Sequence, residues 1–252
     1  MAKIIAIANQ KGGVGKTTTA VNLAACLAAV GKKLLLIDFD PQGNATSGCG
    51  VDKSALETTV YHVIINGTDI HEVIRHTDYK MDLLPANLDL AGAELELVAA
   101  VAREMRLKRA LDAVRTEYDY IIIDCPPSLG LLTLNSLTAA DTVLMPIQCE
   151  FYALEGVSQL MNTVQLVQQN LNPELKIEGV LLTMYDSRTK LSEQVAAEVR
   201  TYFKEQAYHT MIPRTVRLSE APSYGMPIIA YDGGSRGAEV YMQLAKEVLS
   251  RE

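Results

Sequence analysis

The chain has 252 residues, of which 48% are hydrophobic and 21% charged, and these proportions exclude an intrinsically disordered protein. Its net charge of -7 means that the overall field does not attract nucleic acid, so any such binding needs a local basic surface. The apolar runs are no longer than strands and no signal peptide is apparent, so we expect a cytoplasmic protein without a membrane span.

Short apolar runs alternate with stretches of helical periodicity along the chain. The runs expected to form strands are Ile4–Ala8, Leu34–Asp38, Leu83–Leu84, Tyr120–Asp124, Thr142–Ile147 and Val180–Met184. The stretches expected to form helices are approximately 17–30, 89–116, 152–171, 191–206 and 236–250. Nearly continuous apolar strands separated by helices are typical of a parallel sheet that is buried on both faces. We therefore predict a single α/β domain over residues 1–252, with a mostly parallel twisted sheet covered by helices on both faces.

Two segments do not follow this alternation. Residues 39–60 are polar and contain glycine, which favours a mobile loop over a functional site. Residues 207–236 hold several prolines and glycines after Ile212. We expect this second segment to wrap the surface with only short structured pieces.

A glycine-rich loop stands between the first predicted strand and the first predicted helix. Residues 9–18 read NQKGGVGKTT, a phosphate-binding loop in its usual strand–loop–helix context. Such a loop turns backbone N–H groups toward a phosphate, and the helix N-terminus adds a positive dipole. Lys16 can then reach the terminal phosphates, and the Thr17 hydroxyl can bind Mg²⁺. The first glycine of the usual pattern is replaced by Gln10, and a second lysine, Lys11, follows it.

Polar residues lie at the ends of several predicted strands, at the edge of a parallel sheet where ligands bind. These residues are Asn9, Asp38, Asp124, Gln148 and Thr183. Mg²⁺ prefers oxygen ligands and retains several waters, so we expect Asp124 to hold it through water and Asp38 to support its water shell. Asp40 lies in the loop after the second strand and can approach an attacking water. Together these groups predict an enzyme that transfers a phosphoryl group to water.

With these motifs, the chain resembles the deviant Walker-A ATPases of the ParA/MinD branch, and among them the short chromosomal ParA (Soj) type. The strings that carry the resemblance are KGGVGKTT at 11–18, DFDPQGN at 38–44, IIIDCPPSLG at 121–130, EFYALEG at 150–156 and IPRTVRLSEAPSYG at 212–225. The resemblance implies a P-loop NTPase fold, ATP and Mg²⁺ as ligands, and a homodimer that sandwiches ATP.

The resemblance also implies roles for individual residues. ATP would be bound by Lys11, Gly12, Gly13, Val14, Gly15, Lys16, Thr17, Thr18, Thr183 and Pro213, the last two at the adenine ring. Lys11 would reach the phosphates of the partner subunit, and Gly12 would lie at the closest contact between subunits. Lys11, Lys16 and Asp40 would be catalytic, with Asp40 aligning the water. Thr17, Asp38 and Asp124 would serve the metal.

Dimers of this family bind double-stranded DNA without sequence preference, and ParB-type centromere-binding proteins stimulate the ATP hydrolysis that releases them. The resemblance therefore implies a slow, partner-stimulated ATPase for chromosome or plasmid partition, associated with the bacterial nucleoid when ATP is bound. The candidate DNA contacts are Arg188 and Arg217, with Arg214, Lys190, Arg200 and Lys204 as weaker choices. A solvated helix surface is the simpler interpretation of Lys190, Arg200 and Lys204. Because the chain begins at its first strand, we expect no N-terminal helix-turn-helix domain.

The main alternative is a MinD-like ATPase that cycles on and off a membrane, which would need a basic amphipathic helix at the C-terminus. Residues 238–252 carry three glutamates against one lysine and one arginine. Their apolar positions Val240, Leu244 and Val248 instead predict a helix packed on the body of the protein.

Two further alternatives share the loop. A nitrogenase-reductase-like electron carrier would need two cysteine thiolates per subunit that converge on one iron–sulfur cluster. The spacing of Cys26, Cys49, Cys125 and Cys149 indicates reduced, buried thiols instead. A nucleotide-gated scaffold that hardly hydrolyses ATP is disfavoured because the chain retains the residues that hydrolysis needs.

Overall fold

The computed structural model describes residues 1–150 and 153–251, with the side chains of 153–156 excepted. These residues form one eight-stranded sheet in the order β3-β4-β2-β5-β1-β6-β7-β8. Its strands are β1 (Lys3–Ile7), β2 (Leu34–Asp38), β3 (Arg75–His76), β4 (Asp82–Leu84), β5 (Tyr120–Asp124), β6 (Thr142–Gln148), β7 (Lys176–Tyr185) and β8 (Ala207–Pro213). Within the described ranges the neighbouring strands are parallel except β3 and β4, which confirms the mostly parallel sheet.

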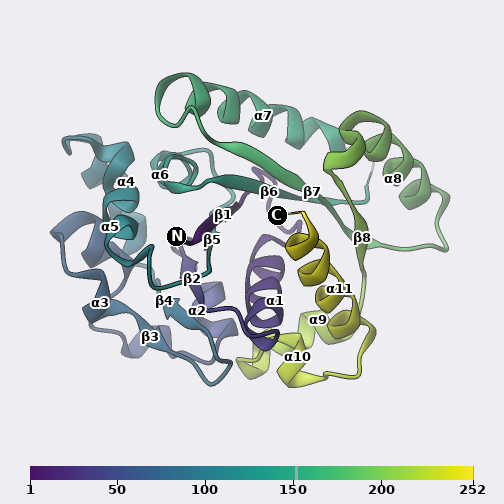
Figure 1. Ribbon diagram of the computed structural model, residues 1–252, viewed down its shortest axis with the longest axis horizontal. Helices are drawn as coiled ribbons and strands as arrows, with labels where there is room; N and C mark the ends of the chain where they lie inside the picture. Colours follow the sequence, from purple (N-terminus) through teal and green to yellow (C-terminus); the bar gives the residue numbers. More distant parts are fainter. Residues whose placement is uncertain (151–152, 252) are drawn as a thin grey trace.

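Helices cover both faces of this sheet (Figure 1). On one face lie α3 (Ile70–Val73), α4 (Leu90–Val98), α5 (Arg106–Val114), α6 (Leu131–Ala139), α7 (Ala153–Asn170) and α8 (Lys190–Phe203). On the other face lie α1 (Lys16–Ala29), α2 (Asn44–Gly48), α9 (Val216–Glu220), α10 (Ile228–Tyr231) and α11 (Arg236–Ser250). The predicted arrangement of layers is therefore confirmed.

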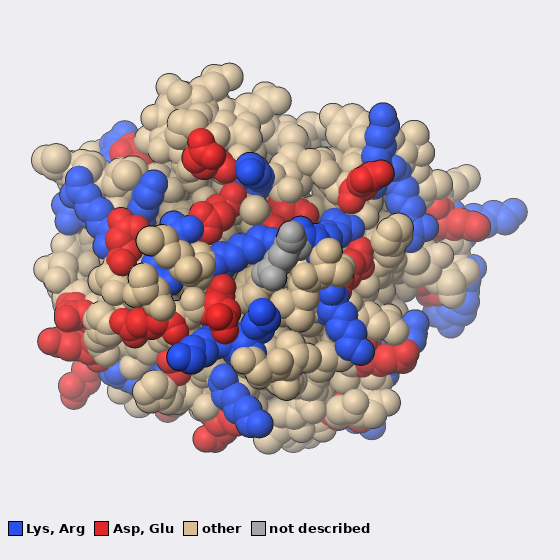
Figure 2. Space-filling view, in the orientation of Figure 1, with Lys and Arg blue, Asp and Glu red and all other residues tan. Residues whose placement is uncertain are grey.

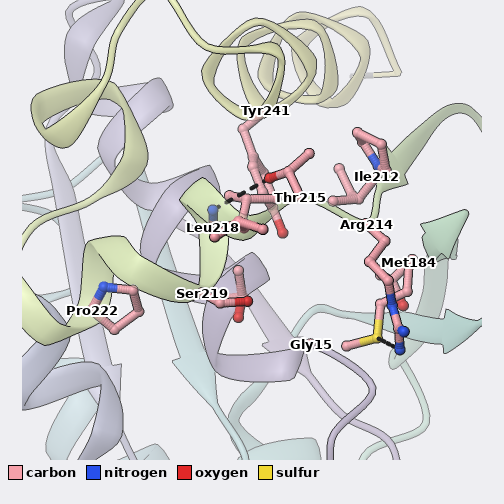
Figure 3. A pocket seen from close by; sticks show the side chains of 13 residues that line it. Gly15, Met184, Ile212, Arg214, Thr215, Leu218, Ser219, Pro222 and Tyr241 are labelled. Carbon is pink, nitrogen blue, oxygen red and sulfur yellow. Dashed lines mark hydrogen bonds between the residues drawn. The ribbon is translucent and has the colours of Figure 1, made fainter.

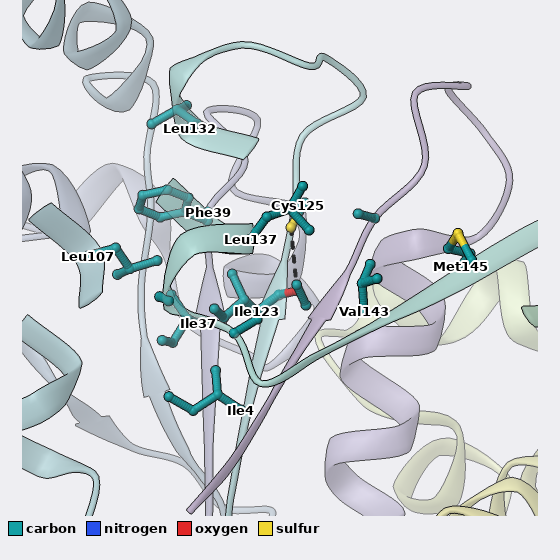
Figure 4. Close-up of a cluster of buried hydrophobic side chains, with 14 of the residues drawn as sticks. Ile4, Ile37, Phe39, Leu107, Ile123, Cys125, Leu132, Leu137, Val143 and Met145 are labelled. Atoms are coloured by element: carbon teal, nitrogen blue, oxygen red, sulfur yellow. Dashed lines mark hydrogen bonds between the residues drawn. The ribbon is translucent and has the colours of Figure 1, made fainter. Parts of the chain in front are cut away.

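The alternation of side chains along the strands builds two separate hydrophobic layers. In β1, Ile4 and Ala6 lie in one layer, whereas Ile5 and Ile7 lie in the other. This is the period of two that a strand imposes on its side chains. Figure 4 shows part of the first layer, where side chains from β1, β2, β5 and β6 meet those of α5 and α6. Because both faces are covered, the polar groups of the site lie at the carboxyl ends of the strands.

The single helix predicted over 89–116 is wrong, because the chain breaks there. After α4 it passes through Ala102, whose φ of 50° is left-handed, and a short 3-10 helix (Arg103–Met105) precedes α5. Asn135 of α6 stabilises the break, since it accepts from the N–H of Leu107 at 3.2 Å and donates to the carbonyl of Arg103 at 2.8 Å. This partner lies on another helix, so periodicity within 89–116 did not reveal it.

The expectation of irregular structure from residue 207 onward is wrong for its first part. Ala207–Pro213 forms the edge strand β8, which pairs with β7. The N–H groups of His209 and Thr210 donate to the carboxylate of Glu247 on α11, at 2.8 and 3.0 Å. A side chain from another element thus replaces a neighbouring strand at this edge. The rest of the segment consists of short helices, including a 3-10 helix at Ala221–Tyr224, as expected.

Other expectations have clear outcomes. Residues 39–60 contain α2 and a 3-10 helix at Lys53–Ala55, so the segment is more ordered than the predicted loop. Val240, Leu244 and Val248 of α11 are buried, which confirms the packed C-terminal helix. In the string at 150–156, residues 151 and 152 lie outside the described residues. Within the described ranges, no helix combines the length and apolar character needed to span a bilayer.

Candidate active site

The glycine-rich loop between β1 and α1 adopts a conformation that requires glycine. Gly13 and Gly15 have φ values of 74° and 86°, in the left-handed region that other residues rarely adopt. Gly15 caps α1 without any side-chain hydrogen bond to the first turn. The N–H groups of that turn are therefore available to a ligand at the positive end of the helix.

Neighbouring strands hold the loop in place. Asn9 accepts from the N–H of Lys11 at 3.0 Å and donates to the carbonyl of Pro146 on β6 at 2.7 Å. On the far side, the Thr183 hydroxyl of β7 donates to the carbonyl of Val14 at 2.8 Å. The predicted strand-end residues Asn9 and Thr183 thus fix the shape of the loop.

The two lysines of the loop have different surroundings. Lys16 is only 7% exposed, and its Nζ donates to the carbonyl of Lys11 at 3.0 Å, across the loop. Burial lowers the pKa of Lys16, and the charge of Asp124 opposes this shift. The Lys11 side chain is partly exposed and forms an ion pair with Glu150 instead. A Cβ on the next residue, Gly12, would meet no atom within 4 Å, so the loop surface beside Lys11 is open.

Two buried carboxylates lie side by side below the loop, because Asp38 and Asp124 are register partners at the ends of β2 and β5. Asp38 accepts from the N–H and the hydroxyl of Thr46, at 2.7 and 2.8 Å. Neither oxygen of Asp124 makes a well-aligned hydrogen bond with a described residue, although the Thr17 hydroxyl lies close enough to lower its pKa. Asp40 is 7% exposed and accepts from the N–H of Gln42 at 2.9 Å.

Burial sets the ionisation of this acidic pair. It raises the pKa of Asp38 to about 6 and the pKa of Asp124 well above its usual range. The charges of Asp38 and Asp40 raise the pKa of Asp124 further, and Lys16 lowers it. A buried carboxylate without well-aligned donors, next to a second buried carboxylate, favours a divalent cation. Asp124 and the Thr17 hydroxyl therefore fit Mg²⁺, whereas both oxygens of Asp38 are already engaged by the backbone and Thr46.

A cleft of about 570 Å³ lies beside the loop (Figure 3). Gly15 and Thr18 line its loop side, and Thr183 and Pro213 line the opposite side, so the structure brings these predicted residues together. The sequence analysis missed Met184, Leu218, Ser219, Pro222 and Tyr241, which also line the cleft. Most of these residues lie in or beside the string at 212–225, and that string is the feature of the sequence that could have revealed them. Such a mixture of apolar groups and hydroxyls suits a planar base beside the phosphate loop.

The six cations considered for DNA come from several elements of the fold. Arg188 and Arg214 line a hollow beside β8. Arg200 and Lys204 line a different hollow, at the C-terminal end of α8. Arg217 lies on α9, and Lys190 begins α8. His209 lines both hollows, and Nη2 of Arg200 lies 3.5 Å from Sδ of Met211 in the first, so the two hollows are adjacent.

The surroundings of the four cysteines do not favour metal or iron–sulfur binding. The four cysteines are buried and free, and burial raises the pKa of Cys26 and Cys125 to about 12 and that of Cys149 to about 11. Burial also raises the pKa of Cys49. The described part of the chain holds no cluster of three or more His, Cys, Asp or Glu that could bind a metal. Because a cluster ligand is a thiolate, these environments disfavour the electron-carrier alternative.

Comparisons with known proteins extend over the whole chain. Residues 2–177 match a family model described as an AAA domain. The sporulation initiation inhibitor protein Soj of Bacillus subtilis is 64% identical over 249 residues, which cover 98% of this chain and 98% of that protein. The chromosome partitioning protein ParA of Myxococcus xanthus is 56% identical over 251 residues, with coverages of 99% and 89%.

A solved structure shows what a similar site holds. A Mycobacterium smegmatis protein described as cobyrinic acid a,c-diamide synthase was solved with a bound ATP analogue and magnesium. It is 42% identical, with a TM-score of 0.89, and the match covers 100% of this chain and 96% of that one.

Proposed function

The chain belongs to the ParA/MinD family of ATPases and is of the Soj/ParA chromosome-partitioning type, and from this premise we propose that ATP converts it into a dimer that binds DNA. ATP and Mg²⁺ are the ligands of its site. DNA binding without sequence preference associates the dimer with the nucleoid. A ParB-type partner then stimulates hydrolysis and releases the dimer, which drives partition.

The contrast between the two loop lysines carries this proposal. Lys16 is buried and donates inside its own loop, where it reaches the phosphates of the ATP that its own chain binds. Lys11 lies at the surface beside the open face of Gly12, and among the described residues its ammonium pairs with Glu150. A lysine so placed can exchange Glu150 for the phosphates bound to a second copy. This supports the sandwich dimer.

In this proposal the acidic residues of the site have different roles in ATP hydrolysis. Mg²⁺, when bound, neutralises phosphate charge during phosphoryl transfer. Thr17 and Asp124 hold the metal, and Asp38 fixes the loop that carries Asp40 through its bonds to Thr46 and to the Asp40 N–H. Asp40 orients the attacking water. Because each chain holds this set, the dimer contains two hydrolytic sites.

In this proposal DNA is bound by arginines near β8, the strand at one edge of the sheet. Arg188 and Arg217 are the main candidates, and Arg214, Lys190, Arg200 and Lys204 are secondary ones. A dimer doubles the number of cations that face the phosphate backbone. Because such binding releases counterions, its affinity falls steeply with salt.

The proposal is tested by DNA binding of the Asp40→Ala protein, in which slow hydrolysis preserves the ATP state. Binding is measured with ATP, ADP or no nucleotide, at two salt concentrations and on two unrelated DNA sequences. We expect binding with ATP alone, weaker at high salt and equal for both sequences. If no nucleotide state binds DNA, the chain remains an ATPase and the DNA-binding function is wrong.

Gly12→Val separates dimerisation from ATP binding. In the monomer the added side chain meets open space, so the variant should fold and bind ATP like the wild type. In a sandwich dimer the same side chain would lie where two backbones meet, so we expect no ATP-dependent dimer. Size-exclusion chromatography with ATP measures the dimer, and calorimetric ATP titration of the same sample is the control. A normal dimer would place the subunit contact elsewhere.

The structure disfavours the membrane-cycling alternative. The apolar residues of α11 pack against α1 and β8 and are not available to a lipid surface. Co-sedimentation with vesicles of anionic lipid in the presence of ATP would reverse this judgement.

A further inference from the structure

A second hollow, of about 550 Å³, lies beside the nucleotide cleft, between the loop after β7, strand β8 and the first half of α11. Arg188, Arg214 and Arg236 line it, together with Asp186 and His209. We call it the arginine hollow. Arg214 and Pro213 line both this hollow and the nucleotide cleft, so the two are adjacent.

Carboxylates of the same chain already engage arginines of the hollow. Asp186 accepts from Nε and Nη2 of Arg188, at 2.9 and 2.7 Å, and also from the Arg188 N–H at 3.0 Å. Glu239 accepts from Nη1 of Arg236 at 2.6 Å. Within the described ranges, Arg214 forms no ion pair, and its Nη2 lies 3.9 Å from Sδ of Met184 (Figure 3).

The same pattern extends beyond the hollow. Arg217 of α9 faces Glu220 at 3.1 Å and Asp232 at 3.3 Å, so two carboxylates surround one guanidinium. On the face of the molecule that Figure 2 shows, basic and acidic side chains interleave. Arg188 and Arg217, the two main candidates for DNA, are thus paired with carboxylates of their own chain.

The pair of Arg188 and Asp186 has a geometry that matters for DNA. A guanidinium binds a phosphate through two parallel N–H donors, in the way that Arg188 here binds the carboxylate of Asp186. Asp186 therefore occupies one of the two edges through which the guanidinium can bind a phosphate, and its charge offsets that of Arg188. Its hydrogen bonds with Arg188 lower the pKa of Asp186 to about 2, so the competing charge persists at every pH used for binding experiments.

We propose that the arginine hollow receives a backbone phosphate of DNA and that Asp186 limits the affinity by competing with this phosphate for Arg188. This inference rests on the proposed function and adds a built-in restraint to it. An arginine that must first leave a carboxylate contributes less to binding than a free one. One chain alone then binds DNA weakly, and stable binding depends on the two copies in the ATP-bound dimer.

Asp186→Asn tests the restraint. The amide keeps an oxygen for the Arg188 N–H, so the turn is preserved while the negative charge is lost. With ATP, we expect DNA affinity to rise about three- to tenfold and the slope of log affinity against log salt to steepen by about 1, the change for one further phosphate contact. Weak binding should also appear with ADP.

Glu72→Gln is the matched control, since it removes the same charge from α3 at the opposite end of the sheet (Figure 1). We expect it to change DNA affinity less than about twofold, because a distant exposed charge is screened. Arg188→Ala in the Asp186→Asn background should remove the gain. Thermal unfolding and ATP-dependent dimerisation of all variants should match the wild type, which separates the effect from misfolding.

The outcomes distinguish the two proposals. If the wild type binds DNA with ATP but Asp186→Asn behaves like Glu72→Gln, the restraint is wrong while the proposed function stands. If the gain in DNA affinity caused by Asp186→Asn persists when Arg188 is also replaced by Ala, the proposed restraint is wrong, because the DNA phosphate would then bind at another site. If Asp186→Asn raises the affinity for ATP and leaves DNA binding unchanged, the hollow serves the nucleotide. If neither the wild type nor any variant binds DNA, the proposed DNA-binding function is itself wrong.

Discussion

Lys16→Ala is expected to abolish ATP binding at ordinary nucleotide concentrations. Lys16 is the buried cation of the phosphate loop, and its Nζ already lies across the loop on the carbonyl of Lys11. Removing a buried partner of a charged group costs about 2–5 kcal/mol, which corresponds to a roughly 30-fold to several-thousand-fold loss of affinity. Titration calorimetry with ATP and Mg²⁺ measures the change directly.

Lys11→Ala is the matched control for this prediction. Lys11 is partly exposed and paired with Glu150, so its removal should change the ATP affinity of the monomer less than about threefold. The ATP-dependent dimer should nevertheless be lost. Equal losses of ATP affinity in the two variants would contradict the division of roles between the lysines. Thermal unfolding without nucleotide confirms that both variants are folded.

Asp124→Asn is expected to stabilise the protein without nucleotide and to impair its hydrolysis. Burial and the neighbouring acids make the Asp124 carboxylate unfavourable, and its oxygens lack well-aligned donors among the described residues. Removing this charge should raise the free energy of unfolding by about 0.5–2 kcal/mol, and Tm by about 2–4 °C for each kcal/mol. From the proposed role of Asp124 at the metal, we expect Mg²⁺-dependent hydrolysis to fall about 10- to 100-fold.

The stability difference between Asp124→Asn and the wild type should depend on pH. A carboxyl whose pKa is raised in the folded state binds its proton more tightly there, so its contribution to stability is present at low pH and lost as pH rises. For Asp38 this loss occurs between its usual pKa near 4 and about pH 6, and for Asp124 it extends higher. The Tm advantage of Asp124→Asn should therefore grow as pH rises above the usual carboxyl pKa near 4.

Calorimetric unfolding at several pH values, with and without Mg²⁺ and ATP, measures both the stabilisation by Asp124→Asn and its dependence on pH. Mg²⁺ with ATP should stabilise the wild type more than the variant, because the metal offsets the charge of Asp124. Glu72→Gln, an exposed charge change, should leave Tm nearly unaltered at each pH. A variant less stable than the wild type, or an advantage independent of pH, would show that the Asp124 carboxylate is not strained in the free protein.

The phosphate loop and the acids after β2 and β5 could be read from the sequence because each depends on neighbours in the chain. Gly13 and Gly15 are required by a local backbone conformation, and Lys16 follows them at a fixed spacing. The apolar runs before Asp38 and Asp124 mark strands, and parallel strands bring their carboxyl ends together. The rule places both residues at the same edge of the sheet, whereas their pairing in register depends on the strand order, which brings β2 beside β5.

The break between α4 and α5 and the edge strand β8 could not be read in this way. Asn135 lies on α6 and Glu247 on α11, far in sequence from the backbone groups that they stabilise. Propensity and periodicity describe only neighbours in the chain. Contacts of this kind therefore override them without leaving a local signal.

By itself the sequence determined the layered α/β fold, the phosphate loop, the acidic pair and the packed C-terminal helix, because local spacing and hydrophobic period specify all four. Only the tertiary structure decided which charges are available. It buries Lys16, leaves Lys11 at the surface with Glu150, and pairs Arg188 with Asp186. The strength of a charge depends on its distance to other charges and to water, and folding sets both.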